Sequence, residues 1–190
     1  MKKIICLYGG PGSGKSTTCA GLFYKLKLLQ FNCEMNREYV KDWVWEDRKI
    51  QDGDQSYFFA KQARKEKLYM QNGVDFIITD SPLILTHYYG MQYDRFEKTH
   101  NTSLIMLQNH HGICKSMGYK VEHYFINRKK KYNPSGRLQT EEVARQIDSE
   151  LRIMLNELGI KYKEIDGDES SVDSIVKDLV GNRVPFHTVV

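Results

Sequence analysis

Residues 8–17 read YGGPGSGKST, and this glycine-rich stretch lies close to the start of the chain. Gly9, Gly14, Lys15 and Ser16 fit the pattern G-x-x-x-x-G-K-[ST], with a short apolar run before it and helical spacing after it. Glycines let the backbone wrap phosphate oxygens, and the start of a helix presents free N–H groups to them. The sequence therefore predicts a phosphate-binding loop between a buried strand and a helix.

The ligand predicted for this loop is ATP with Mg²⁺. The Lys15 ammonium would neutralise charge on the β- and γ-phosphates, and the Ser16 hydroxyl would ligate the metal ion. The residues expected to bind the nucleotide follow one another along the loop and the first helical turn: Gly9, Gly10, Pro11, Gly12, Ser13, Gly14, Lys15, Ser16 and Thr17.

Strand-like and helix-like patterns alternate along the rest of the chain. Short runs suited to buried parallel strands occupy 2–8, 32–38, 74–80, 119–127 and 160–166. Helical spacing occupies 15–30, 54–72, most of 83–118, 140–159 and 170–180. Thr140 is the expected N-cap of the fourth of these helices. The alternation predicts an α/β fold, a three-layer sandwich with a five-stranded parallel sheet, and one domain over 1–190.

Composition narrows the class of protein. The 190 residues are 41% hydrophobic and 27% charged, as in a soluble globular protein. No apolar stretch approaches the roughly 20 residues that span a bilayer, so we expect a cytoplasmic protein without a membrane partner. A formal charge of +4 tolerates an anionic ligand but does not by itself indicate nucleic-acid binding. The four cysteines form no CxxC pair, which favours thiols over disulfides or zinc.

Asp80 ends the clearest strand pattern, VDFIITD. A carboxylate at the carboxyl end of a parallel strand lies near the crevice where α/β sheets bind ligands, and Asp80 would hold Mg²⁺ there. Ser81 follows it, where many ATPases have a second carboxylate that activates water. The guanine-reading pattern Asn-Lys-x-Asp is also missing. These features favour phosphoryl transfer over hydrolysis or sensing.

The segment 128–139, RKKKYNPSGRLQ, carries Arg128, Arg137 and three lysines without an acidic residue. A basic, mobile loop after the fourth strand would close over the triphosphate, exclude water and bring arginines to the transferring group. A solvated basic loop is the alternative interpretation.

The segment 37–47, REYVKDWVWED, combines acidic and aromatic residues just after the second strand. Glu38 would take a proton from an acceptor hydroxyl, with Asp80 as the alternative base, and Trp43 would stack on an aromatic base. Gln62, on the following helix, would offer its amide to a base edge, and a surface glutamine is the alternative interpretation. Both tryptophans would equally suit the core.

Along the chain the four features follow one another as P-loop, acidic-aromatic segment, Asp80 and basic segment, and in that order they resemble the nucleoside and nucleotide kinase superfamily. EYVKDW is similar to the Glu-Pro-Val-x-x-Trp segment of deoxyribonucleoside kinases, which implies that Glu38 is the base and that Trp43 lines the substrate site. FIITDSP resembles the Asp-Arg-Tyr region of thymidylate kinases, and the whole layout resembles phage-encoded nucleotide kinases. Tyr39 and Ser81 stand where these families have proline and arginine, which leaves the acceptor open.

The resemblance implies a Mg-ATP-dependent kinase with a nucleoside or nucleotide acceptor. A nucleoside 5′-hydroxyl, a nucleoside monophosphate and a hydroxymethylated base, free or in DNA, all remain as acceptors. Nicotinamide riboside kinases share this plan. A nucleic-acid-associated ATPase and a nucleotide-binding regulator without turnover are the alternatives. The sequence leaves both a monomer and a homodimer open.

Overall fold

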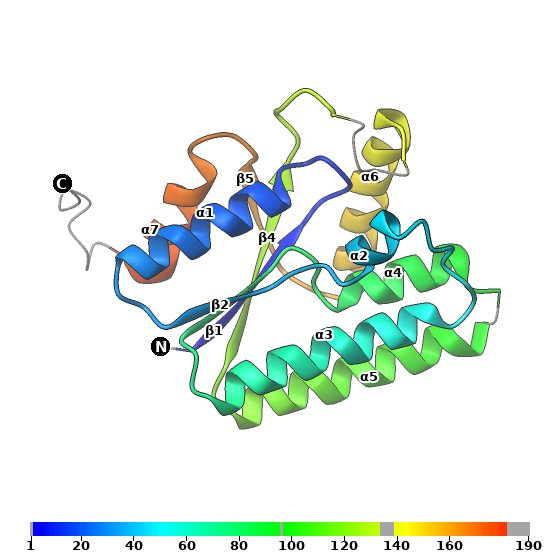
Figure 1. Cartoon of the computed structure of the whole chain (residues 1–190), viewed down its shortest axis with the longest axis horizontal. Helices are drawn as coiled ribbons and strands as arrows, with labels where there is room; N and C mark the ends of the chain where they lie inside the picture. Colours follow the sequence, from blue (N-terminus) through cyan, green and yellow to red (C-terminus); the bar gives the residue numbers. More distant parts are fainter. Residues whose placement is uncertain (1, 96, 134–138, 182–190) are drawn as a thin grey trace.

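The computed structural model describes residues 2–95, 97–133 and 139–181, and the side chains of 97–100 are not described. Within these residues the strands are β1 (Lys3–Tyr8), β2 (Cys33–Asn36), β3 (Phe76–Thr79), β4 (Lys120–Asn127) and β5 (Lys163–Asp166). They form one sheet in the order β2-β3-β1-β4-β5, and every pair of neighbours is parallel (Figure 1). The predicted α/β fold with a five-stranded parallel sheet is confirmed.

Helices cover both faces of this sheet. They are α1 (Lys15–Leu28), α2 (Val40–Trp45), α3 (Asp54–Gln71), α4 (Ile84–Tyr93), α5 (Glu97–Ser116), α6 (Glu141–Glu157) and α7 (Ser171–Val180). Helices α1 and α7 lie on one face, whereas α3, α4, α5 and α6 cover the other (Figure 1). This arrangement gives the three layers expected from the sequence.

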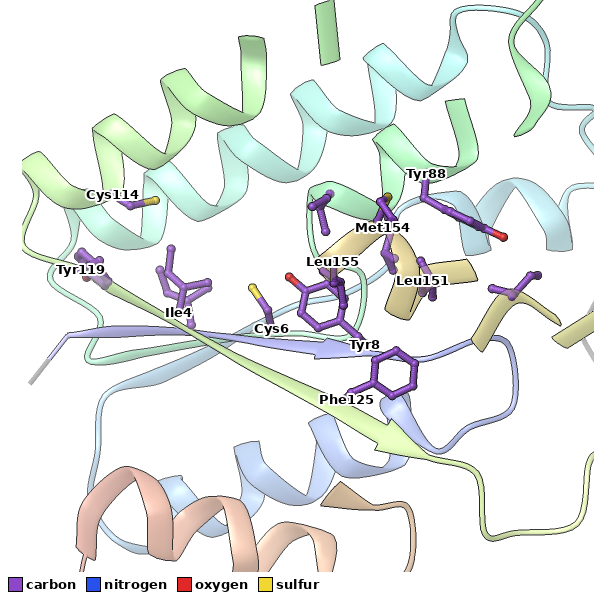
Figure 2. Packing of buried hydrophobic residues seen from close by; sticks show 14 of the residues in the cluster. Ile4, Cys6, Tyr8, Tyr88, Cys114, Tyr119, Phe125, Leu151, Met154 and Leu155 are labelled. Carbon is purple, nitrogen blue, oxygen red and sulfur yellow. The ribbon is translucent and has the colours of Figure 1, made fainter. Parts of the chain in front are cut away.

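The alternation of side chains along β1 explains why one strand contributes to two cores. Successive side chains of a strand point to opposite faces of the sheet. Ile5 and Leu7 pack with α1 and α7, while Ile4, Cys6 and Tyr8 pack with the helices on the other face. Figure 2 shows these last three side chains on the same side of β1. A strand that is buried on both faces has a continuous run of apolar residues, and this run is the pattern that predicts a strand at 2–8.

Two local features add detail that the sequence did not predict. The segment 37–47 contains the short helix α2, whose six residues are too few for helical spacing to be recognised and none of which is buried. The helical region 83–118 is interrupted at Asp94, whose backbone is extended. The Asp94 carboxylate accepts a hydrogen bond from Gly53 N at 3.1 Å, which ties the break to the loop before α3.

The N-terminus of α6 matches its prediction. Thr140 has an extended backbone, and its side-chain oxygen accepts a hydrogen bond from Val143 N at 3.3 Å. Such a cap satisfies one of the free N–H groups of the first turn. All four cysteines are buried and reduced. Among the described residues, no helix is long and apolar enough to cross a membrane.

Parallel topology brings the predicted functional residues to one edge of the sheet. Gly9 follows β1, Glu38 lies two residues after β2, Asp80 follows β3 and Arg128 follows β4. Ligands of open α/β sheets bind at this carboxyl edge. The candidate functional residues therefore lie in the loops after these four strands.

Candidate active site

The loop between β1 and α1 has the backbone shape of a P-loop. Gly14, the N-cap of α1, has a φ of 112°, a left-handed value that an L side chain rarely adopts. The Lys15 Nζ donates hydrogen bonds to the carbonyl oxygens of Gly9 at 2.6 Å and Gly10 at 3.0 Å. The ammonium therefore lies against the loop itself, where a bound phosphate chain would meet its charge.

Glu38 and Asp80 lie together beside this lysine. The strands β2 and β3 are neighbours, and Asn36 pairs with Thr79 at their ends. The backbone N–H of Glu38 donates to Asp80 Oδ1 at 3.3 Å. The structure thus brings together three of the residues that the sequence singled out, from three separate loops.

The charges of these three groups influence one another. Burial lowers the pKa of the Lys15 ammonium, and the carboxylates of Glu38 and Asp80 oppose that shift. Burial raises the pKa of the Glu38 carboxyl; Lys15 opposes the shift, whereas Asp80 adds to it. A carboxylate with a raised pKa is a better proton acceptor than an ordinary surface carboxylate.

The side chains of Ser16 and Asp80 fit a Mg²⁺ ion bound together with a nucleotide. Mg²⁺ prefers oxygen ligands and is held in kinases by one or two protein oxygens plus phosphate oxygens. Ser16, at the first turn of α1, and Asp80 supply a hydroxyl and a carboxylate at this edge. The described part of the chain contains no cluster of three or more His, Cys, Asp or Glu residues that would hold a metal by itself. The donor set therefore suits a nucleotide-bound ion.

A cavity of about 1300 Å³ opens beside the P-loop. Its walls come from the P-loop, the segment after β2, the helices α2, α3 and α4, and the N-terminus of α6. Residues from each wall include Lys15, Ser16, Glu38, Trp45, Gln62 and Tyr89. The volume exceeds that of a usual small-ligand pocket, about 300–1,000 Å³, so a second molecule has room beside a bound phosphate chain.

The two residues expected to contact a base, Trp43 and Gln62, differ in position: Gln62 lines the cavity and Trp43 does not. Trp43 is not among the described residues that line the cavity. Its ring packs edge-on against Phe58, with centroids 4.9 Å apart, and the Arg48 guanidinium lies 3.9 Å from the indole. Trp45, two residues on, lines the cavity.

Gln62 does line the cavity, although the residue is almost fully buried. Its Nε2 donates to the carbonyl oxygen of Ser81 at 2.6 Å, which holds the amide in place beside Asp80. An amide fixed in this way can present its oxygen to a donor group on a ligand.

The Arg128 side chain is buried and has fixed partners, whereas the sequence suggested a residue of a mobile lid. Its side chain is 4% exposed, and its guanidinium bonds to Asp148 on α6 and to the carbonyl oxygen of Pro11 in the P-loop. Arg137, the other arginine of 128–139, lies outside the described residues.

Sequence reasoning missed Asp148 as a residue of the site. Its carboxylate accepts a hydrogen bond from Gly10 N at 2.5 Å. The signal was present in the α6 sequence, because Asp148 falls on the stripe that also carries Ala144, Ile147 and Leu151, all buried. A lone carboxylate on an apolar helical face requires a partner in the interior.

A P-loop after β1, in a parallel sheet ordered β2-β3-β1-β4-β5, defines a P-loop nucleotide-binding protein. Residues 4–171 match a family described as an AAA domain, and the chain belongs to that family. No curated protein matches the chain in sequence.

Solved structures support the fold assignment. The crystal structure of NadR protein in complex with NR is similar with a TM-score of 0.71 and 16% identity over 99% of this chain. This chain spans about half of that one, 54%. The deoxyadenosine kinase from M. mycoides, with products dCMP and dCDP bound, gives a TM-score of 0.54 and 15% identity, covering 93% of this chain and 97% of that one. APE1195 gives 0.50 and 18%, with 97% of each chain covered. The resemblance to P-loop nucleotide kinases is confirmed at the level of the fold.

Proposed function

We propose that this protein is a Mg-ATP-dependent phosphotransferase whose acceptor is a hydroxyl group of a nucleoside-type molecule. The observation that carries the proposal is the position of Glu38. A half-buried carboxylate with a raised pKa lies beside Asp80 and the P-loop lysine and lines the cavity. A hydroxyl acceptor needs a base in this position, whereas a phosphate acceptor is already anionic at neutral pH.

The P-loop residues have a binding role in this mechanism. The N–H groups of residues 12 and 14–17 and the Lys15 ammonium would hold the triphosphate, and Ser16 and Asp80 would hold Mg²⁺. The ion neutralises charge on the phosphates when it is bound. Because these donors are already in place, little reorganisation is needed as negative charge develops on the transferring group.

Glu38 has the proton-transfer role. Its carboxylate accepts the proton of the acceptor hydroxyl as the hydroxyl oxygen forms a bond to the γ-phosphorus. The bond from the γ-phosphorus to the β,γ-bridging oxygen breaks, and that oxygen carries its electron pair away on ADP. The products are ADP and a phosphomonoester of the acceptor.

The rest of the cavity would bind the body of the acceptor. Gln62 offers a fixed amide for a base edge, and Trp45 and Tyr89 offer aromatic faces for stacking. Two of the similar structures are described with NR and with dCMP and dCDP. These ligands support a nucleoside-type acceptor for a cavity of this kind.

A screen with radiolabelled ATP tests the proposal. The wild-type protein is incubated with γ-labelled ATP, Mg²⁺ and a panel of nucleosides, nucleoside monophosphates and DNA oligomers, with and without a hydroxymethylated base. The same panel is run with Glu38→Gln and with Glu34→Gln, a matched change on β2 at a residue paired with Lys27 outside the cavity. Label is expected on a hydroxyl acceptor with wild type and Glu34→Gln, and far less with Glu38→Gln. Release of inorganic phosphate that DNA stimulates, without a labelled acceptor, would instead establish a nucleic-acid-associated ATPase.

A further inference from the structure

The buried carboxylate of Asp148 contacts two segments of the site at once. Asp148 is 9% exposed and lies on the face of α6 that packs into the core. A charge in such a position is tolerated only when it is paired and fully hydrogen-bonded. The two oxygens of this carboxylate bond to different groups.

One oxygen holds the P-loop and the other holds Arg128. Asp148 Oδ1 accepts from Gly10 N at 2.5 Å. Asp148 Oδ2 accepts from Arg128 Nη2 at 3.0 Å and from Arg128 Nε at 3.2 Å. Each oxygen therefore has its own donor, and the charge of Asp148 is neutralised by an arginine.

Arg128 also bonds to the P-loop directly. Its Nη1 donates to the carbonyl oxygen of Pro11 at 2.8 Å, and Nη2 lies within 3.4 Å of the carbonyl oxygen of Ala144. The N–H of residue 10 and the C=O of residue 11 are thus both bound by one ion pair. This pair therefore holds two peptide units of the loop, the one that joins residues 9 and 10 and the one that joins residues 11 and 12.

Close packing reinforces the connection. A Cβ at Gly10 would lie 2.4 Å from the carbonyl oxygen of Ala144, so helix α6 approaches the loop as closely as a glycine allows. A Cβ at Gly12 would lie 3.0 Å from the ring of Tyr132, which belongs to the basic segment 128–139.

We propose that Asp148 is a positioning residue: through Arg128 it holds the first half of the P-loop in its phosphate-binding shape and connects that shape to residues 128–133. The inference rests on the proposed function only in that the P-loop must bind ATP. Arg128 is then a second positioning residue, because four of its five guanidinium N–H groups already donate to protein oxygens.

Calorimetric titration with ATP tests this proposal without any acceptor. The variants are Asp148→Asn, Arg128→Met and the double variant Arg128→Met with Asp148→Leu. The double change removes both charges and leaves no unpaired ion in the core, so it is expected to fold even where a single change does not. Arg145→Ala is the matched control, since it breaks an exposed ion pair with Glu141 on the same helix.

Each variant of the pair is expected to bind ATP at least tenfold more weakly than wild type, and the double variant is expected to be no weaker than the worse single variant. Such non-additivity is the sign of two residues that act as a unit. Amide exchange at residues 9–14 is expected to speed up in the double variant while exchange in β4 stays unchanged. A loss of overall stability alone would not produce that pattern.

Two results would overturn the inference. The first is wild-type ATP affinity in the folded double variant. The second is tighter ATP binding by Asp148→Asn together with weaker binding by Arg128→Met, because Arg128 would then contact the nucleotide directly. A wild-type protein that binds ATP but phosphorylates nothing would contradict the proposed function and leave the inference intact.

Discussion

The backbone amide of Glu38 donates a hydrogen bond to the Asp80 carboxylate, and this contact joins the ends of β2 and β3. It orients Asp80 through a peptide group, so the Glu38 side chain is not used for that purpose. Two carboxylates next to one P-loop lysine can therefore divide their tasks, with one near the metal and the other near the acceptor. Separate substitutions should distinguish these tasks.

Replacing Glu38 by glutamine should lower kcat about 10²- to 10⁴-fold, the usual contribution of a general base, and leave ATP affinity close to wild type. Steady-state rates with the acceptor found in the screen, together with ATP titration, measure both quantities. Asp80→Asn serves as the comparison, because it should weaken Mg²⁺ binding and so raise the Mg²⁺ concentration that activity requires. A near-wild-type rate for Glu38→Gln beside an inactive Asp80→Asn would remove Glu38 from the mechanism.

The raised pKa of Glu38 also predicts how stability depends on pH. The native state binds this proton more tightly than the unfolded chain, so the stabilisation is complete below the ordinary glutamate pKa and is lost as pH rises through the native value. Glu38→Gln removes the titrating group. The variant should therefore be more stable than wild type at neutral pH, and the difference should vanish in acid. Urea unfolding at several pH values measures it; a difference independent of pH would contradict the assignment.

Replacing Lys15 by alanine should cost about 3 kcal/mol of transition-state stabilisation, roughly two orders of magnitude in kcat/KM, and leave the fold intact. The physical reason is that its ammonium lies against the P-loop carbonyls, where the phosphate chain binds. Lys27→Ala is the control, since Lys27 lies on α1 in an exposed ion pair. Phosphotransfer within tenfold of wild type by a folded Lys15→Ala protein would refute this role.

The parts of the site that were predictable from sequence are local in the chain. The P-loop is a pattern of eight neighbouring positions, and Asp80 directly follows an apolar run. Parallel topology then brought Glu38 to Asp80, because strands that alternate with helices place their carboxyl ends at one edge.

The remaining parts depend on contacts that no short pattern encodes. Asp148 reaches Gly10, 138 positions away in the chain. Whether Trp43 or Trp45 lines the cavity depends on the orientation of the short helix α2, which the packing of Trp43 on Phe58 determines. In both cases tertiary packing selects among side chains that look equivalent in the sequence.

The last prediction concerns a buried ion pair between α3 and α5. His110 Nε2, on α5, lies 2.8 Å from Glu66 Oε2, on α3. Glu66 Oε1 accepts from the side chain of Asn36, which also donates to the carbonyl oxygen of Gln62. Burial alone would lower the pKa of His110, but hydrogen bonds with Cys114 and Glu66 raise it to about 10. The imidazole is therefore charged at neutral pH and balances a buried carboxylate.

The ion pair should add to the free energy of unfolding over a defined range of pH. The native state holds the His110 proton more tightly than the unfolded chain, so the contribution is complete below about pH 6.5. It decreases as pH rises toward the native pKa of about 10. His110→Gln should cost about 3 kcal/mol at neutral pH, because Glu66 is left buried without its counter-charge. Urea unfolding between pH 6 and pH 10 should show that the wild type approaches the variant as pH rises, whereas His111→Gln, at an exposed neighbour, should parallel the wild type. Parallel curves for the wild type and His110→Gln would mean that the pair is not ionised, and the loss of stability would then come from packing.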